Sequence, residues 1–213
     1  FGTMTKNGDK YENLTSLWDQ GGITAVKVHP ETGAVFIGYH SGSWIYQYDG
    51  TNFIPKFQLP DAAGAAASKG NINAIAFDKP GTTAYIVSRK NHVIYKASYD
   101  MATGEFSDVK LLAGSFGVTG YADGTGTSAQ FNEPSQGDVD EEGNFYVADR
   151  GNHCIRVITP DGEVSTYAGQ NKAGMVDGIA SLAEFNNPEG CQFGPDGALY
   201  VADYSNHAIR KVE

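Results

Sequence analysis

The chain has 213 residues, enough for one large domain or two small ones. It carries 25 acidic and 15 basic residues, a formal net charge of −10, and this field disfavours binding to polyanions such as DNA and RNA. No apolar stretch is long enough to span a membrane, and the chain opens at Phe1 without a signal peptide, as expected for a processed product or a fragment. Twenty-seven glycines and 12% aromatic residues are typical of short strands joined by tight turns.

A repeated pattern organises the chain after the first 19 residues. The first two copies are the weaker ones and contain VFIGYHSGSWIYQ and AYIVSRKNHVIYK. The last two copies both read FN-x-P, then YVAD, then NH-x-IR, and their YVAD tyrosines are 54 residues apart. Self-similarity at this spacing indicates a repeat architecture. The four copies span residues 20–59, 71–114, 131–169 and 186–213.

Each copy reads as up to four short strands. In the best copy we expect strands near 136–140, 144–149, 154–159 and 163–168, rich in the β-favouring residues Val, Ile, Tyr and Phe. The breaks are Glu142-Gly143, Gly151-Asn152 and Asp161-Gly162, which suit turns with positive φ. The last copy has three strands. The prediction is an all-β protein, a β-propeller of four-stranded antiparallel blades with about four blades visible.

The Asn-His pairs at 152–153 and 206–207, with the YVAD and IR segments around them, resemble the NHL repeat family. The linkers at 113–134 and 168–188 are similar to those of secreted bacterial NHL proteins, which often carry an N-terminal immunoglobulin-like (IPT/TIG) domain. The resemblance implies a six-bladed ring and a secreted, periplasmic or cell-surface location. We therefore expect residues 1–213 to be one propeller domain or a fragment of a larger ring, with a compact four-bladed ring as the alternative.

Residues 1–19 supply one or two further strands, which we expect to belong to a neighbouring or a closing blade. Closure of a ring between its termini would remove exposed strand edges, which otherwise invite aggregation.

An acidic and a basic residue recur seven positions apart across one turn of the two best copies. Asp149 and Arg156 form the first pair, and Asp203 and Arg210 form the second. The weaker copies lack both charges and carry Ser88 with Tyr95, and Tyr39 with Tyr46. Loss of both charges together is expected of a structural ion pair, because removing one partner leaves a buried charge.

The Asn-His turns hold three of the five histidines at one repeat position: His92, His153 and His207. A zinc site needs converging ligands, and a ring of blades could bring such turns together. We favour the structural reading, in which the asparagines (Asn152 and Asn206) form turns and each imidazole bonds nearby backbone. The sequence leaves any metal site unknown.

Two regions are candidate binding elements. Asp123 and Asp177 occupy matched places in the linkers, where they form turns or, on the alternative reading, help to hold Ca²⁺. The first copy has an aromatic cluster that includes Tyr39, His40 and Trp44, which could pack between blades or stack on a ligand. Loops on a rigid scaffold are common carriers of function.

No catalytic constellation is visible: the chain has no G-x-S-x-G, no H-E-x-x-H and no Walker sequence. We predict a non-catalytic binding or scaffold propeller without a resident cofactor, which recognises a protein, peptide or glycan through its loop face. The alternative is a metal-dependent lyase or hydrolase with an ion in the central channel. For that role the predicted inner strands offer Asn73 and Asp138 and little else. The oligomeric state is left open.

Overall fold

The chain folds into consecutive antiparallel sheets. The computed structural model describes residues 2–7 and 10–16 as backbone, and residues 22–39, 42–61 and 70–213 with their side chains. Within these ranges every regular element is a β-strand or a single 3-10 turn. None of the described segments is a helix long and apolar enough to cross a bilayer.

Four sheets follow one another along the chain, and we call them blades 1 to 4. Blade 1 joins β3 (Ile23–Val28), β4 (Val35–Tyr39), β5 (Trp44–Tyr48) and β6 (Phe53–Gln58). Blade 2 joins β7 (Ile72–Phe77), β8 (Thr83–Ser88), β9 (Val93–Asp100) and β10 (Glu105–Ala113). Blade 3 joins β12 (Pro134–Val139), β13 (Phe145–Asp149), β14 (Cys154–Ile158) and β15 (Glu163–Gly169), with the short linker strand β11 (Gly124–Thr125) outside β15. Blade 4 joins β16 (Pro188–Phe193), β17 (Leu199–Asp203) and β18 (Ala208–Val212).

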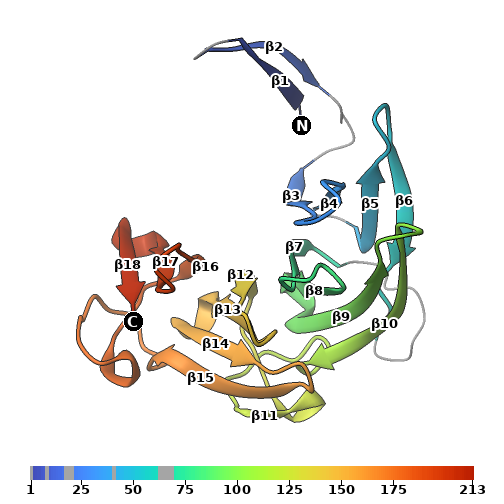
Figure 1. Cartoon of the computed structure of the whole chain (residues 1–213). Helices are drawn as coiled ribbons and strands as arrows, with labels where there is room; N and C mark the ends of the chain where they lie inside the picture. The colour runs from blue at the N-terminus through green and yellow to red at the C-terminus, as the bar shows by residue number, and fades with distance from the viewer. Residues whose placement is uncertain (1, 8–9, 17–21, 40–41, 62–69) are drawn as a thin grey trace.

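The blades stand side by side in an arc, with their first strands toward the centre and their last strands at the rim (Figure 1). The inner strands β3, β7, β12 and β16 each contact the next one in the series. This confirms the predicted all-β propeller of four-stranded antiparallel blades. A separate two-stranded sheet pairs β1 (Gly2–Asn7) with β2 (Lys10–Ser16), so the assignment of residues 1–19 to a neighbouring or closing blade stays a prediction.

Two kinds of turn lie at opposite ends of the inner strands. We call the turns between the first and second strands of each blade the inner-hairpin turns; they span residues 29–34, 78–82, 140–144 and 194–198. In blades 2, 3 and 4 the turns between the second and third strands are the 3-10 turns η1 (Arg89–Asn91), η3 (Arg150–Asn152) and η5 (Tyr204–Asn206). Each of these turns ends on a histidine in the left-handed conformation, with φ of 53–56°. Successive strands of a blade run in opposite directions, so the last strand of one blade ends on the side that carries η1, η3 and η5. The first strand of the next blade begins on that side, and the blade-to-blade linkers therefore start and finish there. They include two further 3-10 turns, η2 (Gly126–Ser128) and η4 (Ala180–Leu182).

The hydrophobic core is divided among the seams, by which we mean the contacts between neighbouring blades. One buried cluster joins blades 1 and 2, a second joins blades 2 and 3, and a third joins blades 3 and 4. The two phenylalanines of the FN-x-P segments, Phe131 and Phe185, are almost fully buried in the second and third clusters. Each side chain of this kind stabilises a seam by about 1.5–3 kcal/mol through burial alone. The linkers therefore contribute to packing as well as connection.

Candidate ligand-binding site

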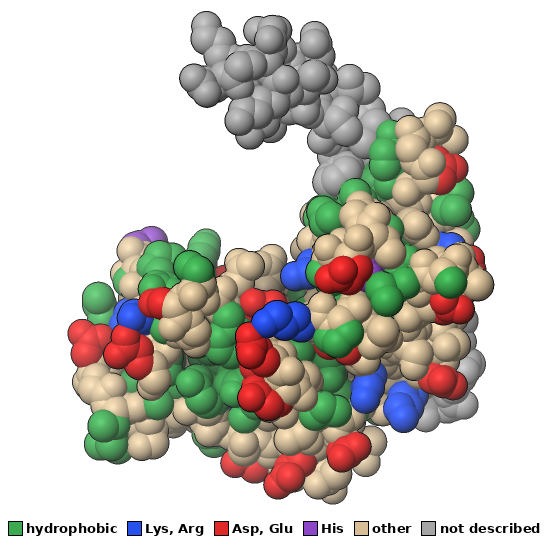
Figure 2. All heavy atoms as spheres, in the orientation of Figure 1, with side chains coloured by type: hydrophobic (Ala, Val, Ile, Leu, Met, Phe, Trp, Pro, Cys, Tyr) green, Lys and Arg blue, Asp and Glu red, His purple; other side chains and the backbone are tan. Residues whose placement is uncertain are grey.

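A cavity opens where the inner-hairpin turns of all four blades meet, at one mouth of the space that the four inner strands border, which we call the channel. We call this cavity the turn-face cavity; its volume is about 810 Å³, in the range of small-molecule sites. Acidic side chains gather around two basic ones over this inner region (Figure 2). The lining contains six carboxylates, Glu31, Asp78, Asp138, Asp140, Glu141 and Glu142, against the two lysines Lys27 and Lys79. The excess of four negative charges favours neutral or cationic ligands.

Two of these carboxylates build the turns on which they lie. The Asp140 carboxylate accepts hydrogen bonds from the backbone N–H groups of Glu142 (3.0 Å) and Asn144 (2.8 Å). Asp78 holds the equivalent position in blade 2 and accepts from the N–H of Thr83 at 3.0 Å. Aspartate is favoured here because its short side chain can accept from the backbone two or more residues further on. The turn chemistry of the repeat therefore places acidic groups at this mouth.

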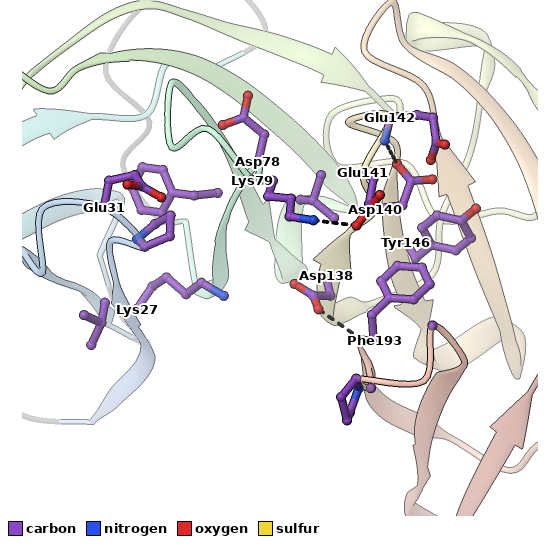
Figure 3. Close-up of a pocket in the computed structure, with 17 residues that line it drawn as sticks. Lys27, Glu31, Asp78, Lys79, Asp138, Asp140, Glu141, Glu142, Tyr146 and Phe193 are labelled. Atoms are coloured by element: carbon purple, nitrogen blue, oxygen red, sulfur yellow. Dashed lines mark hydrogen bonds and ion pairs between the residues drawn. The ribbon is translucent and has the colours of Figure 1, made fainter.

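The glutamates extend farther from the turns than the aspartates. Glu141 of blade 3 forms an ion pair with Lys79 of blade 2, with 2.5 Å between Oε1 and Nζ (Figure 3). The hydrogen bond and charge of Lys79 lower the pKa of Glu141. Glu31 and Glu142 are both exposed at the cavity. Their carboxylates can accept hydrogen bonds from an incoming ligand.

One wall of the cavity is aromatic. The rings of Tyr146 and Phe193 meet edge to face, with centroids 5.1 Å apart at 86°, and Tyr167 packs against Tyr146 at 4.9 Å and 90°. Figure 3 shows Tyr146 and Phe193 beside the carboxylates of the third inner-hairpin turn. Burial, helped by the charge of Asp140, raises the pKa of Tyr146 to about 12, so the phenol keeps its proton at neutral pH. The wall thus combines apolar ring surface with a hydroxyl that can donate.

Behind this mouth, polar groups of the inner strands bond between blades. A second cavity of about 210 Å³ lies among the four inner strands. Asn73 Nδ2 donates to Ser135 Oγ at 2.7 Å, and the N–H of Phe193 donates to Asp138 Oδ2 at 3.1 Å. Among the residues that the structure describes, no three His, Cys, Asp or Glu side chains are grouped to hold a metal ion. Asn73 and Asp138, the residues on which the alternative enzymatic reading rests, are engaged in these seam contacts.

The opposite mouth carries a balanced ionic network. Arg89 bonds Glu189 at 2.8 Å and Glu133 at 3.4 Å, while Arg150 bonds the same two glutamates at 2.9 Å and 3.2 Å respectively. The four residues come from blades 2, 3 and 4 and from the linker between blades 2 and 3. Their charges cancel, and each guanidinium is paired twice. This network joins three blades at the end of the channel remote from the turn-face cavity.

The structure brings the repeated Asp and Arg together in both blades. Arg156 Nη1 lies 3.2 Å from Asp149 Oδ2, and the Arg210 and Asp203 atoms are separated by 3.1 Å. Burial raises the pKa of Asp149 to about 6, against the opposing effect of hydrogen bonds from the Asn132 N–H, Asn152 and Arg156. The pair therefore remains ionised at neutral pH.

The linker aspartates lie against the same arginines. Arg156 Nη2 bonds Asp123 Oδ1 at 2.6 Å and the carbonyl of Ala122 at 2.9 Å. Arg210 makes the matching contacts with Asp177 and Val176. Each arginine thus ties a hairpin to the linker that precedes its blade. The linker carboxylates are held by guanidinium groups and lie at the end of the strands opposite the turn-face cavity.

The remaining predicted residues are also remote from the cavity. The side chain of Asn152 donates to Asp149 and, at 2.7 Å, to the linker carbonyl of Gly120. Asn206 makes the matching bonds with Asp203 and, at 2.7 Å, with the linker carbonyl of Gly174. His153 accepts from the next blade, and His207 is exposed. Tyr39 is the last residue of β4, and its ring centroid lies 6.0 Å from that of Tyr46. Trp44 is the first residue of β5, and neither Tyr39 nor Trp44 lines the turn-face cavity. His40 lies outside the described residues.

Sequence reasoning missed the turn-face cavity and its lining. A signal was present: Asp78 and Asp140 occupy the same repeat position, each directly after an inner strand. A recurring acidic residue at that position predicts one acidic end of the channel. The aromatic wall had no such signal, because Tyr146 and Phe193 come from different blades.

Comparison with known proteins agrees with this architecture. Residues 131–158 match the family model described as NHL repeat. A bovine (Bos taurus) protein, NHL repeat-containing protein 2, is 37% identical over 81 residues, which cover 38% of this chain and 11% of that protein. The repeat resemblance is thus borne out for residues 131–158.

Two solved structures illustrate the range of proteins with this fold. An auxiliary nutrient binding protein from Bacteroides thetaiotaomicron superposes with a TM-score of 0.85 at 29% identity, covering 94% of this chain and 50% of that one. Virginiamycin B lyase from Staphylococcus aureus superposes with a TM-score of 0.57 at 15% identity, covering 89% and 52% of the two chains, which is a likeness of fold alone. The chain therefore spans about half the length of these solved chains and about a tenth of the curated relative.

Proposed function

We propose that this chain is the ligand-binding part of a non-catalytic NHL-type propeller and that it takes a carbohydrate in the turn-face cavity. The cavity itself carries the proposal, since a hollow of about 810 Å³ is lined by both aromatic rings and carboxylates. Tyr146 and Phe193 offer apolar ring surface, while Glu31 and Glu142 offer acceptors for hydroxyl groups. An auxiliary nutrient binding protein among the structural neighbours supports a binding role.

Charge narrows the class of ligand. Six carboxylates against two lysines repel anionic sugars and nucleic acids, so a neutral glycan is expected. A peptide with Lys or Arg side chains is the competing ligand, because it would gain from the same charges. We further propose an extracellular or periplasmic location, supported by the nutrient-binding neighbours.

The test is a calorimetric binding screen of the 213-residue chain against neutral oligosaccharides, acidic oligosaccharides and Lys/Arg-rich peptides. We expect binding to neutral oligosaccharides that weakens at least tenfold in Phe193→Ala and in the double variant Glu31→Gln/Glu142→Gln. Glu163→Gln, an exposed change in β15 outside the cavity, is the matched control and should bind as the wild type does. Retention of peptides alone, or equal binding by all variants, would contradict the carbohydrate proposal.

The metal-dependent alternative has a separate readout. It requires an ion held in the channel near Asn73 and Asp138, whose side chains already bond neighbouring blades. Elemental analysis of purified protein decides between the two: a tight stoichiometric ion favours the enzymatic reading. Protein that binds its sugar unchanged after chelation supports the non-catalytic one.

A further inference from the structure

Two histidines of the 3-10 turns reach across seams to the backbone of the following blade. His92 of blade 2 accepts at Nδ1 from the N–H of Glu133, at 2.9 Å, where the chain enters blade 3. His153 of blade 3 accepts at Nδ1 from the N–H of Asn187, at 3.1 Å, where the chain enters blade 4. The same bond is thus made twice, at equivalent places in two seams.

Both halves of this contact have a fixed local geometry. Each histidine sits in the left-handed region at the end of its turn, with φ of 55–56°, and its ring meets the backbone of the neighbouring blade. Glu133 and Asn187 are also left-handed, with φ of 51° and 50°, and their N–H groups face the ring. Left-handed backbone is uncommon outside glycine, and here it occurs on both sides of both seams. The contact is therefore built into the repeat.

The bond demands a neutral imidazole. Nδ1 can accept only while it carries no proton, and a protonated ring would present N–H to N–H. In His92 the other nitrogen, Nε2, lies 3.1 Å from Thr119 Oγ1, which can accept a hydrogen bond from the Nε2–H group of the neutral ring. Half-burial is the main reason why the pKa of both histidines lies below its usual value.

The charged groups facing the rings act in both directions. Glu133 raises the pKa of His92 and partly offsets the burial. Arg150 lowers the pKa of His153, whereas Asp203 raises it. Burial is the largest effect at both rings, so the neutral form prevails at neutral pH.

We propose that His92 and His153 are acid-sensitive latches that close the seams between blades 2 and 3 and between blades 3 and 4. Above about pH 6.5, the ordinary value for histidine, both bonds are intact. As the pH falls through the lowered pKa, protonation removes both acceptors, and the blades lose contact at the linker end of the seams. The stabilisation is therefore present at neutral pH and lost on acidification.

His207 provides the matched control within the chain. It occupies the same position after η5, with φ of 53°, but its ring is exposed and has no hydrogen-bond partner among the described parts of the chain. Asparagine tolerates the left-handed region, and its side-chain oxygen can take the place of Nδ1 as an acceptor that does not titrate. His92→Asn/His153→Asn should keep the latches closed at any pH, and His207→Asn should change nothing.

The experiment measures melting temperature at pH 7.5 and 5.5 for the wild type and both variants. Between pH 7.5 and 5.5, the melting temperatures of the wild type and of His207→Asn should fall by about 2–4 °C per latch more than that of the double variant. A shift of this size is typical of one hydrogen bond in a domain of this length. Asp149, whose pKa is raised to about 6, titrates in the same interval in all three proteins, so the comparison cancels it. Equal losses in all three would overturn the proposal.

Amide hydrogen exchange of the unmodified chain gives a second, independent measure. Corrected for intrinsic rates, the protection of the Glu133 and Asn187 amides should fall at least tenfold between pH 7.5 and 5.5. The amide of Gln130, which donates to the carbonyl of Ala122, should keep its protection. Constant protection of Glu133 and Asn187 would refute the latch even if the substituted proteins failed to fold.

Discussion

Arg156 lies 3.2 Å from Asp149 inside blade 3, and both side chains are fully inaccessible to solvent. In blade 2 the same two positions hold Tyr95 and Ser88, and both side chains are uncharged. Tyr95 Oη nevertheless donates to the carbonyl of Pro60, and Ser88 Oγ donates to that of Gly70. In both blades these side chains connect the hairpin of the second and third strands to the linker that precedes the blade. The contacts involve charged groups in blade 3 and neutral hydroxyl groups in blade 2.

This relationship predicts strong coupling between the two positions. Arg156→Leu leaves the buried carboxylate of Asp149 without its cation and should lower the free energy of unfolding by about 3–5 kcal/mol. Asp149→Asn should cost less, because Arg156 keeps its ion pair with Asp123. The double variant Asp149→Ser/Arg156→Tyr copies blade 2 and should lose much less than the sum of the single changes. Urea unfolding of the three proteins measures the coupling. Additive losses would mean that the two residues act independently.

The phenylalanine at the start of blade 3 is expected to be a major contributor to its seam. Phe131 is fully buried between blades 2 and 3, so Phe131→Ala should cost about 3–5 kcal/mol of unfolding free energy. Met175 lies in the next linker with 64% of its surface exposed, and Met175→Ala should stay within about 0.5 kcal/mol of the wild type. Thermal unfolding compares the two. A small loss for Phe131→Ala would show that the linker packs loosely.

Gly137 on inner strand β12 should not tolerate a side chain. A Cβ at this position would lie 2.0 Å from the Tyr146 carbonyl oxygen and 2.9 Å from the Phe145 ring, and the backbone atom cannot move aside cheaply. Gly137→Ala is expected to lower stability by about 1–3 kcal/mol, as overpacking does elsewhere. Gln136→Ala, an exposed change on the same strand, serves as the comparison. Denaturant midpoints that agree for the two variants would rule out the steric argument.

The ion pair at the cavity mouth should contribute little to folding. Lys79 and Glu141 are about 70–80% exposed, so water and salt screen the attraction between their charges. Lys79→Ala should therefore leave the unfolding midpoint nearly unchanged while making the cavity more negative. A clear downward shift of the urea midpoint in Lys79→Ala would show instead that the pair holds blades 2 and 3 together.

The pairings within a blade could be predicted from the sequence because they are local. The residues of one hairpin are joined by a few turn residues, so alternation and turn chemistry fix their register. Asp149 and Arg156 are seven positions apart and pair across such a hairpin, as expected from their joint replacement in blade 2. Asp123 and Asp177, the binding residues predicted in the linkers, pair with the repeated arginines, and their binding role stays a prediction.

Contacts across seams could not be predicted in this way. His153 and Asn187 are separated by 34 residues, and Tyr146 and Phe193 by 47, so their approach depends on how one blade is rotated against the next. The sequence by itself determined the repeat, the strands and the charge partners inside each blade, since these follow from short-range geometry. The tertiary structure alone decided where the acidic turns converge, which rings line the cavity and which backbone amides the histidines meet, because packing between blades sets those distances.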